Sequence, residues 1–93
     1  MLLKKVIKNL PIKISNINIK GLSLDSRKIK KNYLFFAVRG TEFNGEKYIL
    51  DAIDKGAKAV VCSQKCKIKN IKVPIIKVNK ISEVLTYACK IFY

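Results

Sequence analysis

The apolar run LFFAV, at positions 34–38, constrains the fold of this chain more than any other segment. A strand with no polar position has to be covered on both faces, which is typical of a parallel sheet with helices on either side. The run AKAVVCS predicts a second buried strand at 59–62. The run VPIIKV predicts a third strand at 73–78, and Pro74 indicates that this strand is an edge strand or begins there.

Apolar residues recur at helical spacing in three further segments, which predicts helices at 2–9, 46–55 and 82–92. Gly56 is the expected C-terminal stop of the second helix, and Ser82 is the expected cap of the third. The residues predicted to share one apolar face of the second helix are Tyr48, Ile49, Ala52 and Ile53.

Alternation of apolar and polar residues predicts extended structure at 12–19, and again at Leu22 and Leu24 as an edge or half-buried strand. Strands that alternate with helices through short connections predict an α/β fold with at least one right-handed crossover. A length of 93 residues allows one modest core. We therefore expect a single small domain with a mixed, mostly parallel sheet flanked by helices.

The net charge of +14 suits an anionic partner such as a nucleic acid, an anionic membrane or a phosphorylated ligand. The lysines, however, are spread along the whole chain, and an AT-rich genome would produce the same excess of Lys, Ile and Asn. A small basic nucleic-acid-binding module remains an alternative; it would concentrate its cations and aromatic rings on one face. The charge by itself therefore identifies no partner.

The three cysteines, Cys62, Cys66 and Cys89, are too few for a four-ligand zinc site in a chain without histidine. We interpret them as structural thiols, which together with the absence of a secretory signal predicts a cytoplasmic protein. The opening segment MLLKKVIKNL is too short and too charged to span a membrane. The motifs GxGxxG and GxxxxGK[ST] are absent, so we expect no catalytic residue, metal site or nucleoside triphosphate loop in this chain.

Two polar segments follow predicted strands: Asp25-Ser26-Arg27, and the glycine-flanked loop at 40–45. Because ligands bind beyond the carboxyl ends of strands in open α/β sheets, these segments are expected to meet at one rim. A hydroxyl, backbone N–H groups and an aromatic ring there would suit a nucleoside diphosphate. The alternative for each segment taken alone is an ordinary turn.

The ordered segments LSLDSRKIK, LFFAVRGTEFNG, KYILDAIDKGAKAVV and VPIIKV, ending in ACKIFY, resemble the N-terminal domain of the Mur ligases. The resemblance covers about 19–93 and is strongest to the MurE branch, which adds the third residue of the peptidoglycan stem peptide. The MurF branch, which adds the terminal dipeptide, shares much of the pattern and is the alternative.

The resemblance implies that the domain holds the UDP part of UDP-MurNAc-dipeptide. It also implies that separate central and C-terminal domains join diaminopimelate or lysine to that substrate through an acyl phosphate, using ATP and Mg²⁺. Asp25 and Arg27 match the motif, and we interpret them as supports of the rim. The substrate-binding positions implied by the family motif are Leu24, Ser26, Thr41, Glu42 and Phe43.

Three departures from the family pattern matter. Lys31-Asn32-Tyr33 replaces the usual Pro-Gly-Asp, which should alter only a turn, and Asn44-Gly45-Glu46 replaces Asp-Gly-His near the rim. The family's GTNGKT loop is absent from these 93 residues. We expect residues 1–93 to be the N-terminal UDP-MurNAc-peptide-binding domain of a longer or truncated ligase. The alternative is a stand-alone protein with a binding or regulatory role.

Overall fold

Four strands form one sheet in the order β1-β2-β3-β4, and every neighbouring pair is parallel. The computed structural model describes residues 1–8, 10–38, 45–68 and 72–93. The sheet is therefore entirely parallel within the described residues, where the sequence analysis expected a mixed, mostly parallel one. The strands are β1 (Gly21–Ser23), β2 (Tyr33–Phe36), β3 (Ala57–Ser63) and β4 (Ile75–Val78).

The central strand β2 shows why both faces of the sheet have to be covered. Successive side chains point to opposite faces of a strand, so Leu34 and Phe36 enter one core while Phe35 enters the other. All three side chains are fully buried. In β3 an irregularity in the pairing with β2 leaves Lys58 exposed, after which Ala59 and Val61 join the core that contains Phe36.

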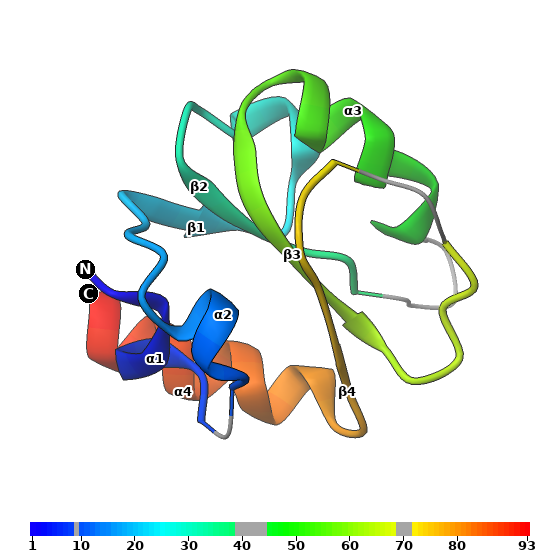
Figure 1. Cartoon of the computed structure of the whole chain (residues 1–93). Helices are drawn as coiled ribbons and strands as arrows, with labels where there is room; N and C mark the ends of the chain where they lie inside the picture. Colours follow the sequence, from blue (N-terminus) through cyan, green and yellow to red (C-terminus); the bar gives the residue numbers. More distant parts are fainter. Residues whose placement is uncertain (9, 39–44, 69–71) are drawn as a thin grey trace.

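The first face of the sheet is covered by α1 (Leu3–Val6), α2 (Ile12–Ser15) and α4 (Ile81–Phe92), which lie together below the sheet in Figure 1. Both ends of the chain lie beside the start of β1. The ammonium group of Met1 donates a hydrogen bond to the carbonyl of Ile19 at 2.9 Å, and the Tyr93 hydroxyl donates one to the carbonyl of Leu22 at 3.5 Å. None of the described helices is long and apolar enough to cross a lipid bilayer.

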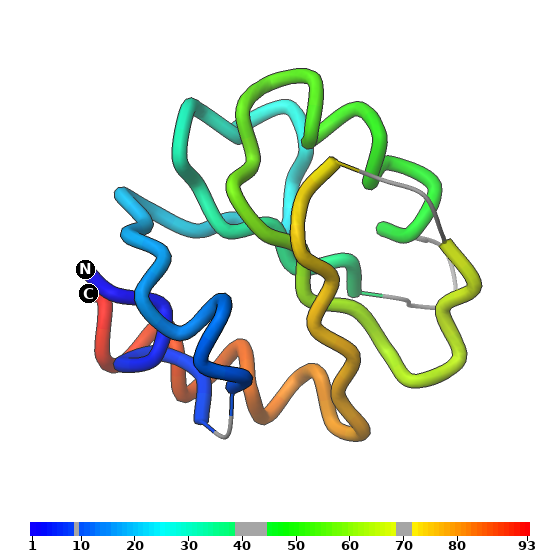
Figure 2. The backbone as a smooth tube through the Cα atoms, in the orientation of Figure 1, coloured from blue at the N-terminus to red at the C-terminus, as the bar shows by residue number. Residues whose placement is uncertain are grey.

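The second face is covered by two 3₁₀ turns and one helix: η1 (Ser26–Lys28), η2 (Gly45–Tyr48) and α3 (Ile49–Asp54). Figure 2 shows the connection from β1 to β2, and the segment from η2 to β3, running over this side of the sheet. Ile29 after η1 shares a core with Ile49 and Ala52 of α3, so η1 and α3 are neighbours.

The turn between η1 and β2 contains the substitution of Asn32 for the family's glycine. Asn32 has a φ of 69°, in the left-handed region that asparagine tolerates best after glycine. Its N–H donates to the carbonyl of Gly56 at 2.8 Å, which fastens this turn to the one before β3. Asn32 therefore takes a backbone conformation at this turn that most other side chains would strain.

Two sequence-based expectations are wrong. The segment 12–19 is not a strand: Pro11, with φ of −57°, starts helix α2, and only Asn18 forms an isolated bridge, with Leu2. Leu10, Ile14 and Ile17 pack against the first core at spacings of four and three residues, which fit a helical turn, and proline favours the start of a helix. Ser82 does not cap α4; the helix starts after Lys80, and the Ser82 carbonyl accepts a hydrogen bond from Thr86.

The other expected elements are confirmed with shifted ends. The buried strands at 34–38, 59–62 and 73–78 correspond to β2, β3 and β4, and β4 is an edge strand, as Pro74 indicated. The predicted helix at 46–55 is divided into the 3₁₀ turn η2 and helix α3.

We expect Gly56→Ala to lower the free energy of unfolding by about 1–3 kcal/mol, the usual range for a strained backbone position. Gly56 has a φ of 113°, and a Cβ there would lie 2.7 Å from the Cα of Lys31. Urea unfolding followed by circular dichroism measures the effect, with Asp54→Ala at an exposed position of α3 as the control. An unchanged urea midpoint for Gly56→Ala would show that a side chain at position 56 does not strain the backbone.

Candidate functional site

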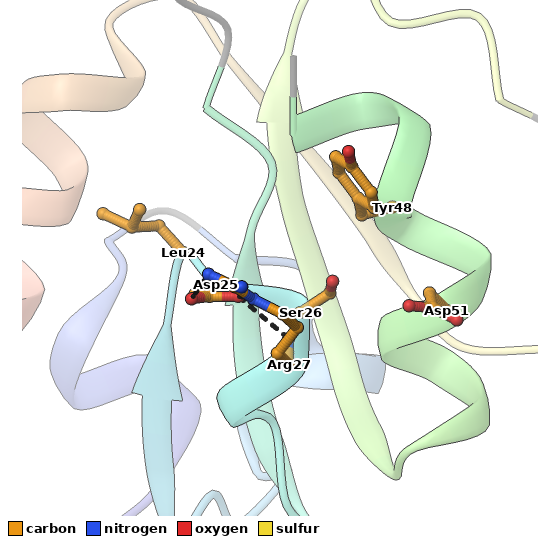
Figure 3. Close-up of a pocket in the computed structure, with 6 residues that line it drawn as sticks. All are labelled: Leu24, Asp25, Ser26, Arg27, Tyr48 and Asp51. Atoms are coloured by element: carbon orange, nitrogen blue, oxygen red, sulfur yellow. Dashed lines mark hydrogen bonds and ion pairs between the residues drawn. The ribbon is translucent and has the colours of Figure 1, made fainter. Parts of the chain in front are cut away.

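A cleft of about 550 Å³ opens beyond the carboxyl end of β1. One wall comes from the segment between β1 and η1, and the other comes from η2 and α3 (Figure 3). The lining residues are Leu24, Asp25, Ser26 and Arg27 on the first wall, and Tyr48 and Asp51 on the second. We call these the β1 wall and the far wall.

The β1 wall is held in place by a tight turn. The hydroxyl of Ser23 accepts a hydrogen bond from the N–H of Asp25 at 3.0 Å and donates one to the carbonyl of Asp25 at 3.2 Å. The Asp25 carboxylate caps η1 by accepting from the N–H of Arg27 at 3.0 Å. These bonds end the strand at Ser23 and turn Ser26 toward the far wall.

Asp25 also pairs with the guanidinium of Arg27 through two hydrogen bonds, of 3.1 Å and 3.0 Å. The side-chain and backbone hydrogen bonds from Arg27 lower the pKa of the Asp25 carboxyl, and Asp25 in turn raises the pKa of Arg27. The Arg27 side chain is 83% exposed, so the pair lies at the surface. The geometry gives Asp25 a supporting role at the rim, as the sequence analysis interpreted it.

Ser26 is 5% exposed and is the one polar residue among the buried ones in the described structure. Its hydroxyl points toward the far wall (Figure 3), and within the described part of the chain no side-chain or backbone group forms a hydrogen bond with it. Leu24 is 43% exposed and extends away from Tyr48. The cleft therefore offers a ligand one recessed hydroxyl beside an apolar side chain.

The other predicted site residues, Thr41, Glu42 and Phe43, lie outside the described residues. The positions that flank them are well defined: the N–H of Gly45 donates to the carbonyl of Val38 at 2.8 Å. A Cβ at Gly45 would lie 2.8 Å from the backbone N and O of Val38, so only glycine allows this approach. Val38 and Gly45 therefore lie side by side, just beyond the end of β2.

The far wall contains the two site residues that the sequence analysis did not propose. Tyr48 was assigned to the buried face of a helix with Ile49 and Ala52; in the structure those two are buried, whereas Tyr48 is 42% exposed and lines the cleft. Asp51 lies one helical turn further along. Their spacing of three residues is compatible with a shared helical face, but the apolar pattern assigned Tyr48 to the buried face instead.

Glu46, which stands where the family has histidine, does not line the cleft. Its carboxylate accepts a hydrogen bond from the Ser63 hydroxyl at 3.2 Å and so links η2 to the carboxyl end of β3. The start of the far wall is therefore fixed by two bonds: Gly45 to Val38, which follows β2, and Glu46 to Ser63, the last residue of β3. In this chain Glu46 therefore supports the wall from behind.

The cysteines pack as structural thiols. Burial and a hydrogen bond with Cys66 raise the pKa of Cys62 to about 12, so this thiol stays protonated at neutral pH. Cys89 is half-buried against the first core. Among the described residues no three His, Cys, Asp or Glu side chains are placed to hold a metal ion.

A parallel α/β domain with a cleft beyond its strand ends has its opening where such sheets bind ligands. Comparison with known sequences gives the family: residues 18–93 match the description "Mur ligase family, catalytic domain". The chain belongs to the Mur ligase family.

The relatives agree with this assignment. The UDP-N-acetylmuramoyl-L-alanyl-D-glutamate--2,6-diaminopimelate ligase of Clostridium tetani is 38% identical over 99 residues, covering the whole chain and 20% of the relative. The enzyme of the same name from Aquifex aeolicus is 39% identical over 75 residues, covering 81% of the chain and 15% of the relative. The chain thus spans only 15–20% of the length of these curated relatives.

Among solved structures, the MurF ligase of Thermotoga maritima in complex with ADP has a similar fold, with a TM-score of 0.64. It is 22% identical and covers 76% of this chain and 16% of that one. At this identity the similarity establishes the fold alone, and it confirms the α/β class expected from the sequence.

We expect the stabilising effect of Asp25 to depend on pH. Because its pKa is lowered in the folded state, its contribution is complete above the unfolded pKa of about 4 and is lost as the pH falls through the folded value. Asp25→Asn should therefore be less stable than the wild type near neutral pH, and the difference should shrink in acid. Urea unfolding at a series of pH values measures it, with Asp54→Asn as the matched control; a difference that is constant with pH would refute it.

The Glu46–Ser63 hydrogen bond should appear as a coupling of about 0.5–1.5 kcal/mol in a double-mutant cycle. Glu46→Ala and Ser63→Ala remove the same bond, so the double variant should lose less stability than the sum of the two. Glu46→Gln keeps an acceptor oxygen and should retain most of the coupling to Ser63. Strictly additive losses would show that the two residues act independently.

Proposed function

We propose that this chain is the UDP-binding N-terminal domain of a MurE-type ligase, with UDP-MurNAc-L-Ala-D-Glu as its substrate. In the whole protein, central and C-terminal domains would add the third amino acid of the stem peptide with ATP and Mg²⁺, in the cytoplasm. The curated relatives are named for 2,6-diaminopimelate, which favours that amino acid over lysine.

The observation that carries the proposal is the recessed hydroxyl of Ser26 in the cleft beyond β1. The family motif assigns a uridine-nucleotide contact to this position, which follows the carboxyl end of β1, and ligands of parallel sheets commonly bind beyond such strand ends. Leu24 adds an apolar surface beside it. Thr41, Glu42 and Phe43 are proposed as the remaining contacts, and Val38 and Gly45 flank their segment directly after β2.

The chemistry of the cleft suits binding rather than catalysis. Its ionisable lining groups are Asp25, paired with Arg27, and Tyr48 and Asp51 on the opposite wall. Among the described residues of the cleft, this set contains no activated nucleophile and no base oriented by a third group. The acyl-phosphate chemistry of the ligase is therefore assigned to the domains outside these 93 residues.

Titration of the 93-residue chain with UDP and with UDP-MurNAc-dipeptide, followed by NMR or calorimetry, tests the proposal. We expect both to bind, and Ser26→Ala to weaken binding about two- to tenfold, the value of one neutral hydrogen bond. Thr41→Ala and Phe43→Ala should also weaken it. Ser82→Ala, on the opposite layer of the molecule, is the matched control.

Binding of UDP that is indifferent to Ser26, Thr41 and Phe43 would remove the site assignment. Tighter binding of UDP-MurNAc-tripeptide than of the dipeptide would instead favour the MurF-type alternative. Failure to bind any uridine nucleotide, together with steeply salt-dependent binding of RNA or DNA, would replace the proposal by the nucleic-acid-binding one.

A further inference from the structure

The far wall of the cleft presents two chemically different groups side by side. Tyr48 is the last residue of η2, and Asp51 follows one turn later in α3. The ring of Tyr48 and the carboxylate of Asp51 both face the β1 wall (Figure 3). Neither belongs to the contacts that the family motif assigns. We propose that the far wall recognises the nucleoside: Tyr48 stacks on the base, and Asp51 accepts a hydrogen bond from a ribose hydroxyl. This inference rests on the proposed function, because it requires the UDP group to occupy the cleft.

The position of Tyr48 suits a stacking platform. The ring is 42% exposed on the cleft and lies across from the hydroxyl of Ser26, so a flat ligand can contact both. Bases stack on aromatic rings irrespective of their hydrogen-bonding pattern, so this contact supplies affinity.

The backbone under Tyr48 is anchored before any ligand arrives. Gly45 is bonded to Val38 at the end of β2, and Glu46 accepts from Ser63 at the end of β3. On the C-terminal side, Ile49 and Ala52 are fully buried against the sheet. A platform held at both ends loses little conformational freedom on binding, which favours affinity.

Asp51 determines which end of the ligand lies at this wall. Its side chain is 56% exposed, and its distance of 3.8 Å to the Lys55 ammonium is longer than a hydrogen bond, so its oxygens can accept from a ligand. A carboxylate attracts hydroxyl donors and repels the oxygens of a diphosphate. The nucleoside is therefore placed against Tyr48 and Asp51, with the diphosphate pointing away from them.

The first test compares Tyr48→Leu and Tyr48→Phe for binding of UDP to the 93-residue chain. Loss of the ring should weaken UDP binding about five- to hundredfold, the range found when a stacking side chain is removed. Tyr48→Phe keeps the ring and should remain within about twofold of the wild type. Leu50→Ala, at an exposed position of α3 that does not line the cleft, is the control.

A second readout separates stacking from a merely structural role. In the wild type and Tyr48→Phe, the ring current should shift the NMR signals of the bound uracil protons upfield, and Tyr48→Leu should abolish this shift. Thermal unfolding verifies that the variants are folded. The stacking role is overturned if Tyr48→Leu binds UDP like the wild type, or if Tyr48→Phe loses as much affinity as Tyr48→Leu.

The role of Asp51 is tested with neutral ligands, so that the charge of the diphosphate does not enter. Asp51→Asn should weaken uridine binding severalfold and leave the binding of 2′,3′-dideoxyuridine unchanged. Equal losses for both ligands, or no loss for uridine, overturn this role. If the wild type binds UDP and neither the Tyr48 nor the Asp51 substitutions change that binding, the role of the far wall is refuted and the proposed function is not. If the wild type does not bind UDP, the proposed function is refuted as well.

Discussion

Burial of the sheet on both faces is the constraint on which the rest of this small structure depends. The side chains of β2 and β3 alternate between two cores, so neither face can be left to solvent. The helices α1, α2 and α4 seal one face, and the turns η1 and η2 with α3 seal the other. Since parallel strands need crossovers, the segments that cover the second face are also those that connect the strands.

The cleft is a consequence of this arrangement. The segment that follows β1 and the segment that precedes α3 meet above the same strand ends, and their cores bring Ile29 and Ile49 together beneath the opening. Each wall is then shaped by short polar bonds: Asp25 to the N–H of Arg27 on one side, Glu46 to Ser63 on the other. The core positions the walls, and these bonds determine which side chains face the ligand.

How far the sequence could predict the structure depended on how much each residue is constrained locally. The run LFFAV leaves a strand no alternative to burial on both faces, and it was predicted correctly. IKIS at 12–15 alternates like a strand, and only its position after Pro11 and against the sheet makes it a helical turn.

The candidate site follows the same rule. Ser26 could be predicted because it follows a strand within a recognisable motif, and the structure places its hydroxyl in the cleft. Tyr48 was missed because it ends a 3₁₀ turn, where three residues rather than 3.6 complete a turn. Because the number of residues per turn changes between η2 and α3, the Tyr48 ring points away from the face shared by Ile49 and Ala52. A helical periodicity applied to 46–55 as one continuous helix does not predict this orientation.

The closure between Val38 and Gly45 has a consequence for how such a domain can diversify. The bond joins two backbone groups, and its only demand on side chains is that Gly45 has none. A side chain at position 45 would force the start of η2 away from Val38, and Tyr48 at the end of η2 would move with it. Variation in the domain is thereby limited at a glycine that does not itself line the cleft.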